Sequence, residues 1–299
     1  MSARLYLNGR WLAPEDATVS VMDRGFLFGD GVYEVIPVYS RQPFRLTRHL
    51  QRLQRSLLAI GMRDPHTLDA WRALIMQLVA EAATEDQSIY IQITRGPVPL
   101  RSHAFPTDPR PTVLMFSEPM QPPDVALVRD GVTAISAPDI RWLRCDIKAT
   151  SLLANCMLRQ LAVDAGCAET VLFRDGVLTE GSAASIFVVR DGVLLAPVKD
   201  QRILPGVTYD VVLELAAAHG VPVSVRDIRE AEVRGADELW LASSPREVLP
   251  IVVLDGEKVG AGKTAPGRPG PLFVAMHGWY QAFKAKAMRG GSDIGASDD

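Results

Sequence analysis

Apolar residues recur at helical spacing in two segments of the N-terminal third of the chain. Beginning at Leu46, they stand three or four residues apart, at Leu50, Leu53, Leu57 and Ile60. The same spacing continues through residues 68–82. Because such a stripe covers one face of a helix, we predict helices over residues 46–60 and 68–82. Two later apolar segments, residues 152–164 and 207–219, are also predicted to be helical.

Short runs rich in β-branched and aromatic residues surround these helices. Residues 4–12 predict two short strands joined at Asn8-Gly9, a dipeptide typical of tight hairpins. A run over residues 26–39 is interrupted by Gly29-Asp30-Gly31. Further strands are predicted at residues 88–94, 112–116, 132–135, 169–174, 186–190, 221–225 and 238–242. In the first part of the chain, strands and helices form separate groups, which favours an α+β fold.

A proline-bearing stretch, Pro119-Met120-Gln121-Pro122-Pro123, is typical of a linker between domains. We therefore predict an N-terminal domain of residues 1–118, a linker of residues 119–131 and a C-terminal domain of residues 132–288. Gly, Pro and charged residues dominate after Gly256. The polar residues 289–299 are expected to form a disordered tail.

The overall charge is small and slightly acidic. A formal charge of −3 provides no basic surface for nucleic acid or an anionic membrane, so small solutes or protein partners are expected instead. Three cysteines cannot complete a disulfide framework, and they form no CxxC pair, which indicates reduced thiols in the cytoplasm. The sequence contains no signal-peptide core and no apolar run of membrane length, and we expect a soluble protein without a metal site.

Lys148 stands in an unusual position for a basic residue. It follows Arg144-Cys145-Asp146-Ile147 at the end of an apparent strand and directly precedes the predicted helix of residues 152–164. A partly desolvated lysine amine is freed to attack a carbonyl carbon. A lysine in this setting could equally be salt-bridged or could extend its amine to water.

An acidic residue, Glu180, follows about thirty residues later in a segment of small residues that leads into a strand. Such a carboxylate could accompany a cationic ring nitrogen, although the segment Thr179–Ser182 could also be a solvated turn. Farther along, Leu204-Pro205-Gly206-Val207-Thr208 places a Pro-Gly turn before a helix, where free backbone amides and a hydroxyl suit a phosphate. Helix capping by Thr208 would explain the same pattern.

Taken together, three segments resemble the fold-type IV pyridoxal phosphate enzymes. These are Ile140–Lys148, Glu180-Gly181-Ser182 running to Phe187, and Ile203–Thr208, and the resemblance extends from about Tyr6 to about Asp255. The family includes D-amino-acid, branched-chain and aminodeoxychorismate enzymes. It implies a smaller α/β N-terminal domain and a larger C-terminal domain with a β-barrel-like core flanked by helices. It also implies pyridoxal 5′-phosphate as the cofactor.

The resemblance assigns roles to individual residues. Lys148 would be the Schiff-base lysine and proton shuttle, and Glu180 would bind the ring nitrogen. Arg52 matches the arginine of the family's His-x-x-Arg signature, which reaches the phosphate. The other cofactor contacts implied are Val207, Thr208, Ser244, Leu204 and Ser182. The chain departs from the family by having Ser185 in place of Asn, and Ala183 and Ala184 in place of hydroxyl residues.

Arg101 and His103 are candidates for substrate binding. Two residues apart in an extended loop, they point the same way and could hold a carboxylate, although a surface loop with incidental charges fits the pattern as well. The Arg-x-His motif is similar to the carboxylate trap of D-amino-acid aminotransferases, in which Tyr33 would take part and Val35 would contact the substrate. In that family the neighbouring subunit supplies the loop, so a homodimer with shared active sites is implied.

Three functions follow as hypotheses. The first is ping-pong transamination between a D-amino acid, such as D-alanine or D-glutamate, and a 2-oxo acid, such as 2-oxoglutarate or pyruvate. The second is branched-chain L-amino-acid transamination or aminodeoxychorismate cleavage on the same scaffold. The third is a cofactor-binding or scaffold protein without catalysis. The set of Tyr33, Arg101 and His103 favours the first hypothesis, and the pair Lys148 and Glu180 argues against the third.

Overall fold

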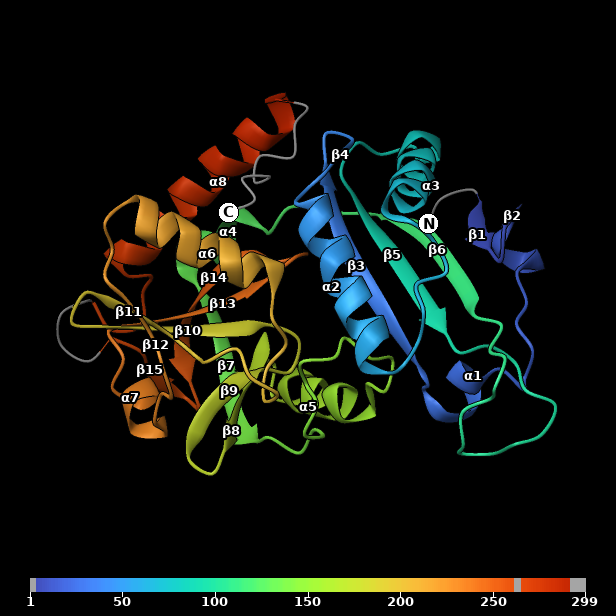
Figure 1. Cartoon of the computed structure of the whole chain (residues 1–299). Helices are drawn as coiled ribbons and strands as arrows, with labels where there is room; N and C mark the ends of the chain where they lie inside the picture. Colours follow the sequence, from blue (N-terminus) through green and yellow to red (C-terminus); the bar gives the residue numbers. More distant parts are fainter. Residues whose placement is uncertain (1–3, 261–264, 291–299) are drawn as a thin grey trace. The chain divides into compact units, whose positions relative to one another are not determined.

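The computed structural model describes residues 4–260 and 265–290, and its chain divides into two compact units (Figure 1). Unit 1 comprises Met1–Gln121, Ile147–Leu152 and Lys284–Asp299, and unit 2 comprises Pro122–Asp146 and Leu153–Phe283. This division differs from the predicted boundaries, because the segment that carries Lys148 belongs to unit 1. The predicted linker contains helix α4, Val125–Asp130. Of the predicted tail, residues 291–299 lie outside the described residues, whereas residues 289 and 290 end a helix.

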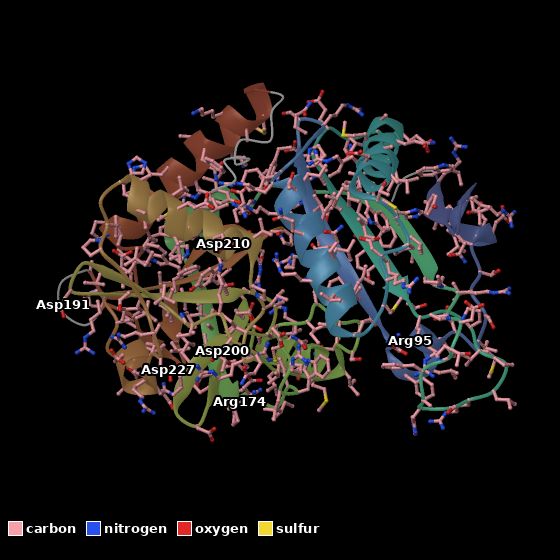
Figure 2. The ribbon with its side chains drawn as sticks, in the orientation of Figure 1. Arg95, Arg174, Asp191, Asp200, Asp210 and Asp227 are labelled. Atoms are coloured by element: carbon pink, nitrogen blue, oxygen red, sulfur yellow. The ribbon has the colours of Figure 1, made fainter. Side chains whose placement is uncertain are left out.

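Unit 1 is built on a six-stranded antiparallel sheet in the order β2-β1-β6-β5-β3-β4. The strands are β1 (Leu5–Leu7), β2 (Arg10–Leu12), β3 (Gly31–Tyr39), β4 (Gln42–Pro43), β5 (Gln87–Thr94) and β6 (Thr112–Pro119). The predicted Asn8-Gly9 hairpin joins β1 to β2, and both turn residues have positive φ. A short helix, α1 (Arg24–Phe28), precedes β3, and Arg95 directly follows β5 (Figure 2).

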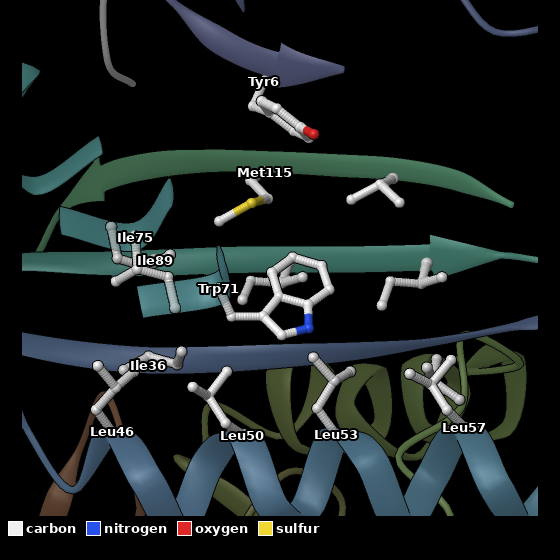
Figure 3. Close-up of a cluster of buried hydrophobic side chains, with 14 of the residues drawn as sticks. Tyr6, Ile36, Leu46, Leu50, Leu53, Leu57, Trp71, Ile75, Ile89 and Met115 are labelled. Atoms are coloured by element: carbon white, nitrogen blue, oxygen red, sulfur yellow. The ribbon is translucent and has the colours of Figure 1, made fainter. Parts of the chain in front are cut away.

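Two helices cover one face of this sheet, as their apolar spacing predicts. They are α2 (Leu46–Ala59) and α3 (Leu68–Glu81). Leu46, Leu50, Leu53 and Leu57 project from α2 toward the strands, and Trp71 projects from α3 into the same cluster (Figure 3). Every second strand residue, such as Ile36, meets them because side chains alternate between the two faces of a sheet.

Unit 2 is built on a nine-stranded mixed sheet in which eight strands follow the order β12-β11-β10-β13-β14-β7-β8-β9 and β15 pairs with β14. The strands are β7 (Val132–Pro138), β8 (Glu169–Arg174), β9 (Val177–Gly181), β10 (Ser185–Arg190), β11 (Val193–Ala196), β12 (Val223–Val225), β13 (Glu238–Ser243), β14 (Glu247–Leu254) and β15 (Glu257–Lys258).

The connection from β9 to β10 requires this sheet to curl. Residues 182–184 alone join the two strands, yet β13, β14, β7 and β8 separate them in the sheet order. In a flat sheet the two strands would stand roughly 24 Å apart, about twice the reach of so short a link. Gly181 N instead donates to Ala184 O at 2.6 Å. The curl produces the predicted barrel-like core, whose buried residues include Ile186, Leu239 and Ile251.

The helices of unit 2 were predicted only in part. The two predicted ones are α5 (Leu153–Asp164) and α6 (Val207–Ala218). Sequence reasoning missed α4, α7 (Glu230–Arg234) and α8 (Pro271–Gly290), as well as β9, β11, β14 and β15. Across residues 4–260 and 265–290, no helix combines the length and apolar character needed to cross a membrane.

Candidate active site

The segment around Lys148 adds to the edge of β3 in unit 1. Tyr33 N donates to Lys148 O at 2.9 Å, and Thr150 N donates to Gly31 O at 3.0 Å. Ala149 pairs with Val32 as an isolated antiparallel bridge. Lys148 thus lies in a loop with one bridge residue, and the strand predicted to end at Lys148 is absent. Hydrogen bonds to β3 fix its backbone.

The amine of Lys148 lies against an aromatic ring. Its Nζ is 4.0 Å from the centroid of the Tyr33 ring, which itself stacks on Tyr90 with centroids 5.8 Å apart. Within the part of the chain that the structure describes, Lys148 has no ion pair with a carboxylate. Among the described residues Lys148 is therefore not salt-bridged, and its amine is available to act as a nucleophile.

In the same unit, a buried cluster joins Glu34 to α2. Arg52 Nε donates to Glu34 Oε1 at 2.6 Å and Nη2 donates to Oε2 at 2.9 Å, while His49 Nδ1 lies 2.9 Å from Oε2. Although burial opposes ionisation, Arg52 and His49 hold the pKa of Glu34 below its usual value. Burial lowers the pKa of His49, and its buried Nε2 has no partner among the described atoms. Arg52, predicted to reach the phosphate, is bidentate on Glu34.

In unit 2, Glu180 lies in β9 and not in the predicted turn. Its Oε1 accepts a hydrogen bond from Arg141 Nη1, and its Oε2 accepts one from Leu204 N at 3.1 Å. Arg141 also binds Asp139, through Nε at 2.9 Å and Nη2 at 2.8 Å. Burial raises the pKa of Glu180, and Arg141 offsets this only in part. A buried carboxylate of this kind gains from an additional cation.

Other predicted cofactor residues lie around the first turn of α6. Gly206 is the N-cap and has no side chain to cap the helix, so Thr208 is not the cap. Val207 and Thr208 are both buried. A Cβ on Gly206 would stand 3.1 Å from Ser185 Oγ, which brings that hydroxyl beside the turn. The uncapped amides suit an anion.

Two predicted serine contacts differ in their surroundings. Ser182 donates from N at 2.9 Å and from Oγ to the buried carboxylate of Glu169, and its carbonyl accepts from Asn155. Its hydroxyl is therefore engaged within the protein. Ser244 lies half-buried in the turn between β13 and β14.

The predicted substrate residues lie in unit 1 at two places. Tyr33 and Val35 share one face of β3 and are half-buried, on the side opposite to α2. Arg101 and His103 are exposed in the loop that follows β5. Both contact Phe28 of α1, with the Arg101 Cζ 5.0 Å from its ring centroid and the His103 ring 5.3 Å away. The structure places each pair together, without a contact between the two pairs among the described residues.

The comparison with protein families decides the class of this protein. Residues 31–254 match the model of amino-transferase class IV. The chain belongs to the class IV aminotransferases. It is 36% identical over 278 residues to a D-alanine aminotransferase of Listeria innocua, covering 93% of this chain and 94% of that one. It is also 36% identical over 269 residues to a D-alanine aminotransferase of Bacillus licheniformis, with 90% and 93% covered.

Solved structures of this class share its fold. The branched-chain amino acid aminotransferase of Escherichia coli superposes with a TM-score of 0.87 at 25% identity, covering 95% of this chain and 94% of that one. That of Thermoproteus uzoniensis gives 0.85 at 26% identity, with 96% and 95% covered. The predicted fold-type IV architecture is confirmed, and so is pyridoxal phosphate as the cofactor of an aminotransferase. In unit 1, the amine of Lys148, which has no carboxylate partner among the described residues, suits that cofactor. In unit 2, the incompletely compensated Glu180 and the start of α6, which has no side-chain cap, suit it as well.

Sequence reasoning missed the residues that orient the predicted ones. Arg141 is paired with Asp139 and also binds Glu180. Glu34 holds Arg52 and His49 in place. The opposite charges of Asp139 and Arg141, two residues apart, were a visible signal for a local ion pair. Nothing near Glu34 in the sequence marks it as the partner of Arg52.

Proposed function

We propose that this aminotransferase transfers the amino group of a D-amino acid, such as D-alanine or D-glutamate, to a 2-oxo acid, such as 2-oxoglutarate or pyruvate. The observation that carries the proposal is the amine of Lys148 lying 4.0 Å from the ring of Tyr33. The amine that we propose as the proton-transfer group is therefore next to a phenol of the predicted carboxylate site. The two D-alanine aminotransferases at 36% identity support the D-specific choice.

In this proposal, different residues of the chain bind the cofactor and transfer the proton. Lys148 would hold the cofactor, Glu180 its ring nitrogen, and Val207, Thr208, Ser244, Leu204, Ser182 and Arg52 the remaining polar groups. When bound, pyridoxal phosphate supplies the carbonyl carbon and the ring that accepts electrons from the substrate Cα. Lys148 Nζ would remove the proton from the substrate Cα as the general base and deliver it as the general acid to the carbon that receives the amino group, not back to Cα.

Tyr33, Arg101 and His103 fix the stereochemistry in this proposal. Their donors bind the α-carboxylate on one side of the pocket, with Val35 contacting the substrate beside them. With the carboxylate held there and the Cα–H directed at Lys148, one enantiomer alone finds room for its side chain. The other enantiomer leaves the guanidinium of Arg101 without its carboxylate, which is costly for a desolvated charge.

We further propose a homodimer in which Arg101 and His103 serve the active site of the second copy. Both side chains are exposed in the single chain, and the neighbouring Leu100 and Phe105 expose 78% and 60% of their surface. A second copy would cover these apolar residues. Mixing inactive Lys148→Ala protein with the weakened Arg101→Ala protein should raise activity above that of Arg101→Ala alone, through hybrid dimers. Verified subunit exchange without this rise in activity would exclude the shared site.

We also propose a cytoplasmic location, with which the three free cysteines agree.

A substrate panel tests the proposed function. Purified enzyme loaded with pyridoxal phosphate should form pyruvate from D-alanine and 2-oxoglutarate, and L-alanine should be a poor donor. L-Leucine belongs in the panel because the solved neighbours include branched-chain enzymes. Faster turnover of L-leucine than of D-alanine would replace the proposal by branched-chain transamination, and cleavage of aminodeoxychorismate would replace it by lyase activity.

A further inference from the structure

One buried guanidinium holds the backbone of the loop that carries Arg101 and His103. Arg24, the first residue of α1, is 3% exposed. Its Nη1 donates to Ser102 O at 2.5 Å and to Ala104 O at 3.2 Å, and its Nη2 donates to His103 O at 3.2 Å. Three consecutive carbonyls of an exposed loop thus converge on a side chain nearly eighty residues earlier in the sequence.

The guanidinium is itself fixed from the other side. Arg24 Nε donates to Asp30 Oδ2 at 2.7 Å, and Asp30 also accepts from Arg95 Nε at 2.8 Å and Nη2 at 3.0 Å. Although burial of Asp30 opposes its ionisation, the two arginines lower its pKa. The ring of Phe105 covers Arg95 at 3.6 Å and Arg24 at 5.8 Å. Arg24 therefore has one orientation, with its fork directed at the loop.

The same helix supplies a platform for the two loop side chains. The Phe28 ring lies 4.9 Å from Arg24 Cζ, 5.0 Å from Arg101 Cζ and 5.3 Å from the His103 ring centroid. Helix α1 thus contacts this loop in two ways: Arg24 binds the carbonyls of residues 102–104, and Phe28 lies against the side chains of Arg101 and His103. A loop ordered before the substrate arrives binds it without first losing its own conformational freedom.

We infer that Arg24 is a positioning residue for substrate recognition, which presents Arg101 and His103 to the α-carboxylate by gripping the carbonyls of Ser102, His103 and Ala104. This inference rests on the proposed role of Arg101 and His103. A lysine at position 24 keeps the positive charge beside Asp30, but its single ammonium cannot reach three carbonyls in the plane of a fork.

Arg95 provides a matched control. It is equally buried, shares the carboxylate of Asp30 and stacks on the same Phe105 ring, yet its Nη2 also donates to Ile60 O at 2.7 Å. Among the described residues it donates to no carbonyl of the 102–104 loop. Arg95→Lys therefore weakens the ion pair with Asp30 but leaves Arg24 bound to the carbonyls of residues 102–104.

The test measures KM and kcat for D-alanine in Arg24→Lys, Arg95→Lys, Arg101→Ala and the double variant Arg24→Lys/Arg101→Ala. Arg24→Lys should raise KM on the order of tenfold with kcat little changed, and Arg95→Lys should stay within about twofold of wild type. The double variant should match Arg101→Ala, because a loop without its arginine gains nothing from being positioned. The inference is wrong if the KM effects of Arg24→Lys and Arg101→Ala multiply in the double variant. It is also wrong if Arg95→Lys raises KM as much as Arg24→Lys does.

Other outcomes separate the inference from the proposed function. If Arg101→Ala leaves KM unchanged, the carboxylate role of Arg101 is wrong, and the inference fails with it. If Arg24→Lys does not fold, Phe28→Leu tests the same positioning without touching the ion pair and should raise KM selectively. Trypsin cleavage of the Arg101-Ser102 bond provides a readout without substrate: it should be faster in Arg24→Lys than in wild type and Arg95→Lys. Equal cleavage in all three proteins would contradict a grip on this loop.

Discussion

Glu34 in unit 1 and Glu180 in unit 2 are both buried glutamates that face an arginine, yet their pKa values move in opposite directions. Burial penalises the ionised form of both. Glu34 receives two hydrogen bonds from Arg52 and one contact from His49, which together lower its pKa. Glu180 shares Arg141 with Asp139, and the nearby Asp139 charge adds to the rise of its pKa.

In our proposal, this difference separates Glu34, which holds Arg52 in place, from Glu180, which binds the cofactor. Glu34 is compensated by its own unit and joins α2 to β3. Glu180 is compensated incompletely, so a cationic ring nitrogen would complete its surroundings. The compensation of a buried carboxylate, more than its burial, therefore distinguishes the two roles that we propose for these glutamates.

Lys148→Ala should have the largest effect. Glu34 already has Arg52 and His49, so loss of the Lys148 amine should leave the folded unit intact. Transamination should fall on the order of 10⁴-fold, because in the proposed mechanism covalent attachment of the cofactor and proton transfer at Cα both depend on this amine. Activity assays alongside thermal unfolding check this. Borohydride trapping of the cofactor on another lysine would contradict the assignment.

Glu180→Gln should rank next and should affect kcat more than stability. A neutral amide can still accept from Arg141 and Leu204, but it cannot keep a proton on the ring nitrogen, so kcat should fall on the order of a hundredfold. Steady-state kinetics with the cofactor in excess, and thermal unfolding, measure the two quantities. A large loss of stability at unchanged kcat would place Glu180 with Glu34 as a structural residue.

Glu34→Gln should show the opposite pattern to Glu180→Gln and affect stability more than kcat. It leaves the buried guanidinium of Arg52 without its carboxylate, which costs on the order of 3 kcal/mol of the free energy of unfolding at neutral pH. Urea unfolding at pH 7 measures this cost. A Glu34→Gln protein as stable as wild type would show that the ion pair contributes nothing.

Glu34 and Glu180 should also contribute differently to the pH dependence of stability, although this effect is smaller than the preceding ones. Because the pKa of Glu34 is lower in the folded than in the unfolded protein, its contribution is complete above the unfolded value and is lost as the pH falls toward the folded value. Glu34→Gln should therefore lose less stability than wild type between about pH 5 and pH 3. The pKa of Glu180 is raised, so Glu180→Gln should not flatten the acid limb. Parallel urea titrations across this range test both signs.

The sequence predicted those parts of the fold in which the apolar period is strong. The stripe from Leu46 to Leu57 predicted α2 almost to its ends, and Asn8-Gly9 predicted the first hairpin. Helix α8 was missed among Gly, Pro and charged residues, although Phe273, Met276 and Tyr280 stand at helical spacing and are buried. That signal was present in the sequence.

The site was predicted through resemblance more than through local pattern. The segment from Arg144 to Ile147 suggested a strand that ends at Lys148, whereas a single bridge, Val32 to Ala149, joins this part of the chain to β3. The grip of Arg24 on Ser102 joins residues 78 positions apart, a pairing that no periodicity reveals. Contacts of this kind arise only when the chain has folded.

The measurement that most directly tests D-amino-acid transamination is a single half-reaction followed by the visible absorption of the cofactor. Enzyme loaded with pyridoxal phosphate is mixed in a stopped-flow instrument with excess D-alanine or excess L-alanine, in the absence of any 2-oxo acid. The account predicts rapid loss of the absorption with D-alanine, release of one pyruvate per active site, and little change with L-alanine. Equal rates with the two enantiomers, or a faster reaction with L-alanine, would contradict it.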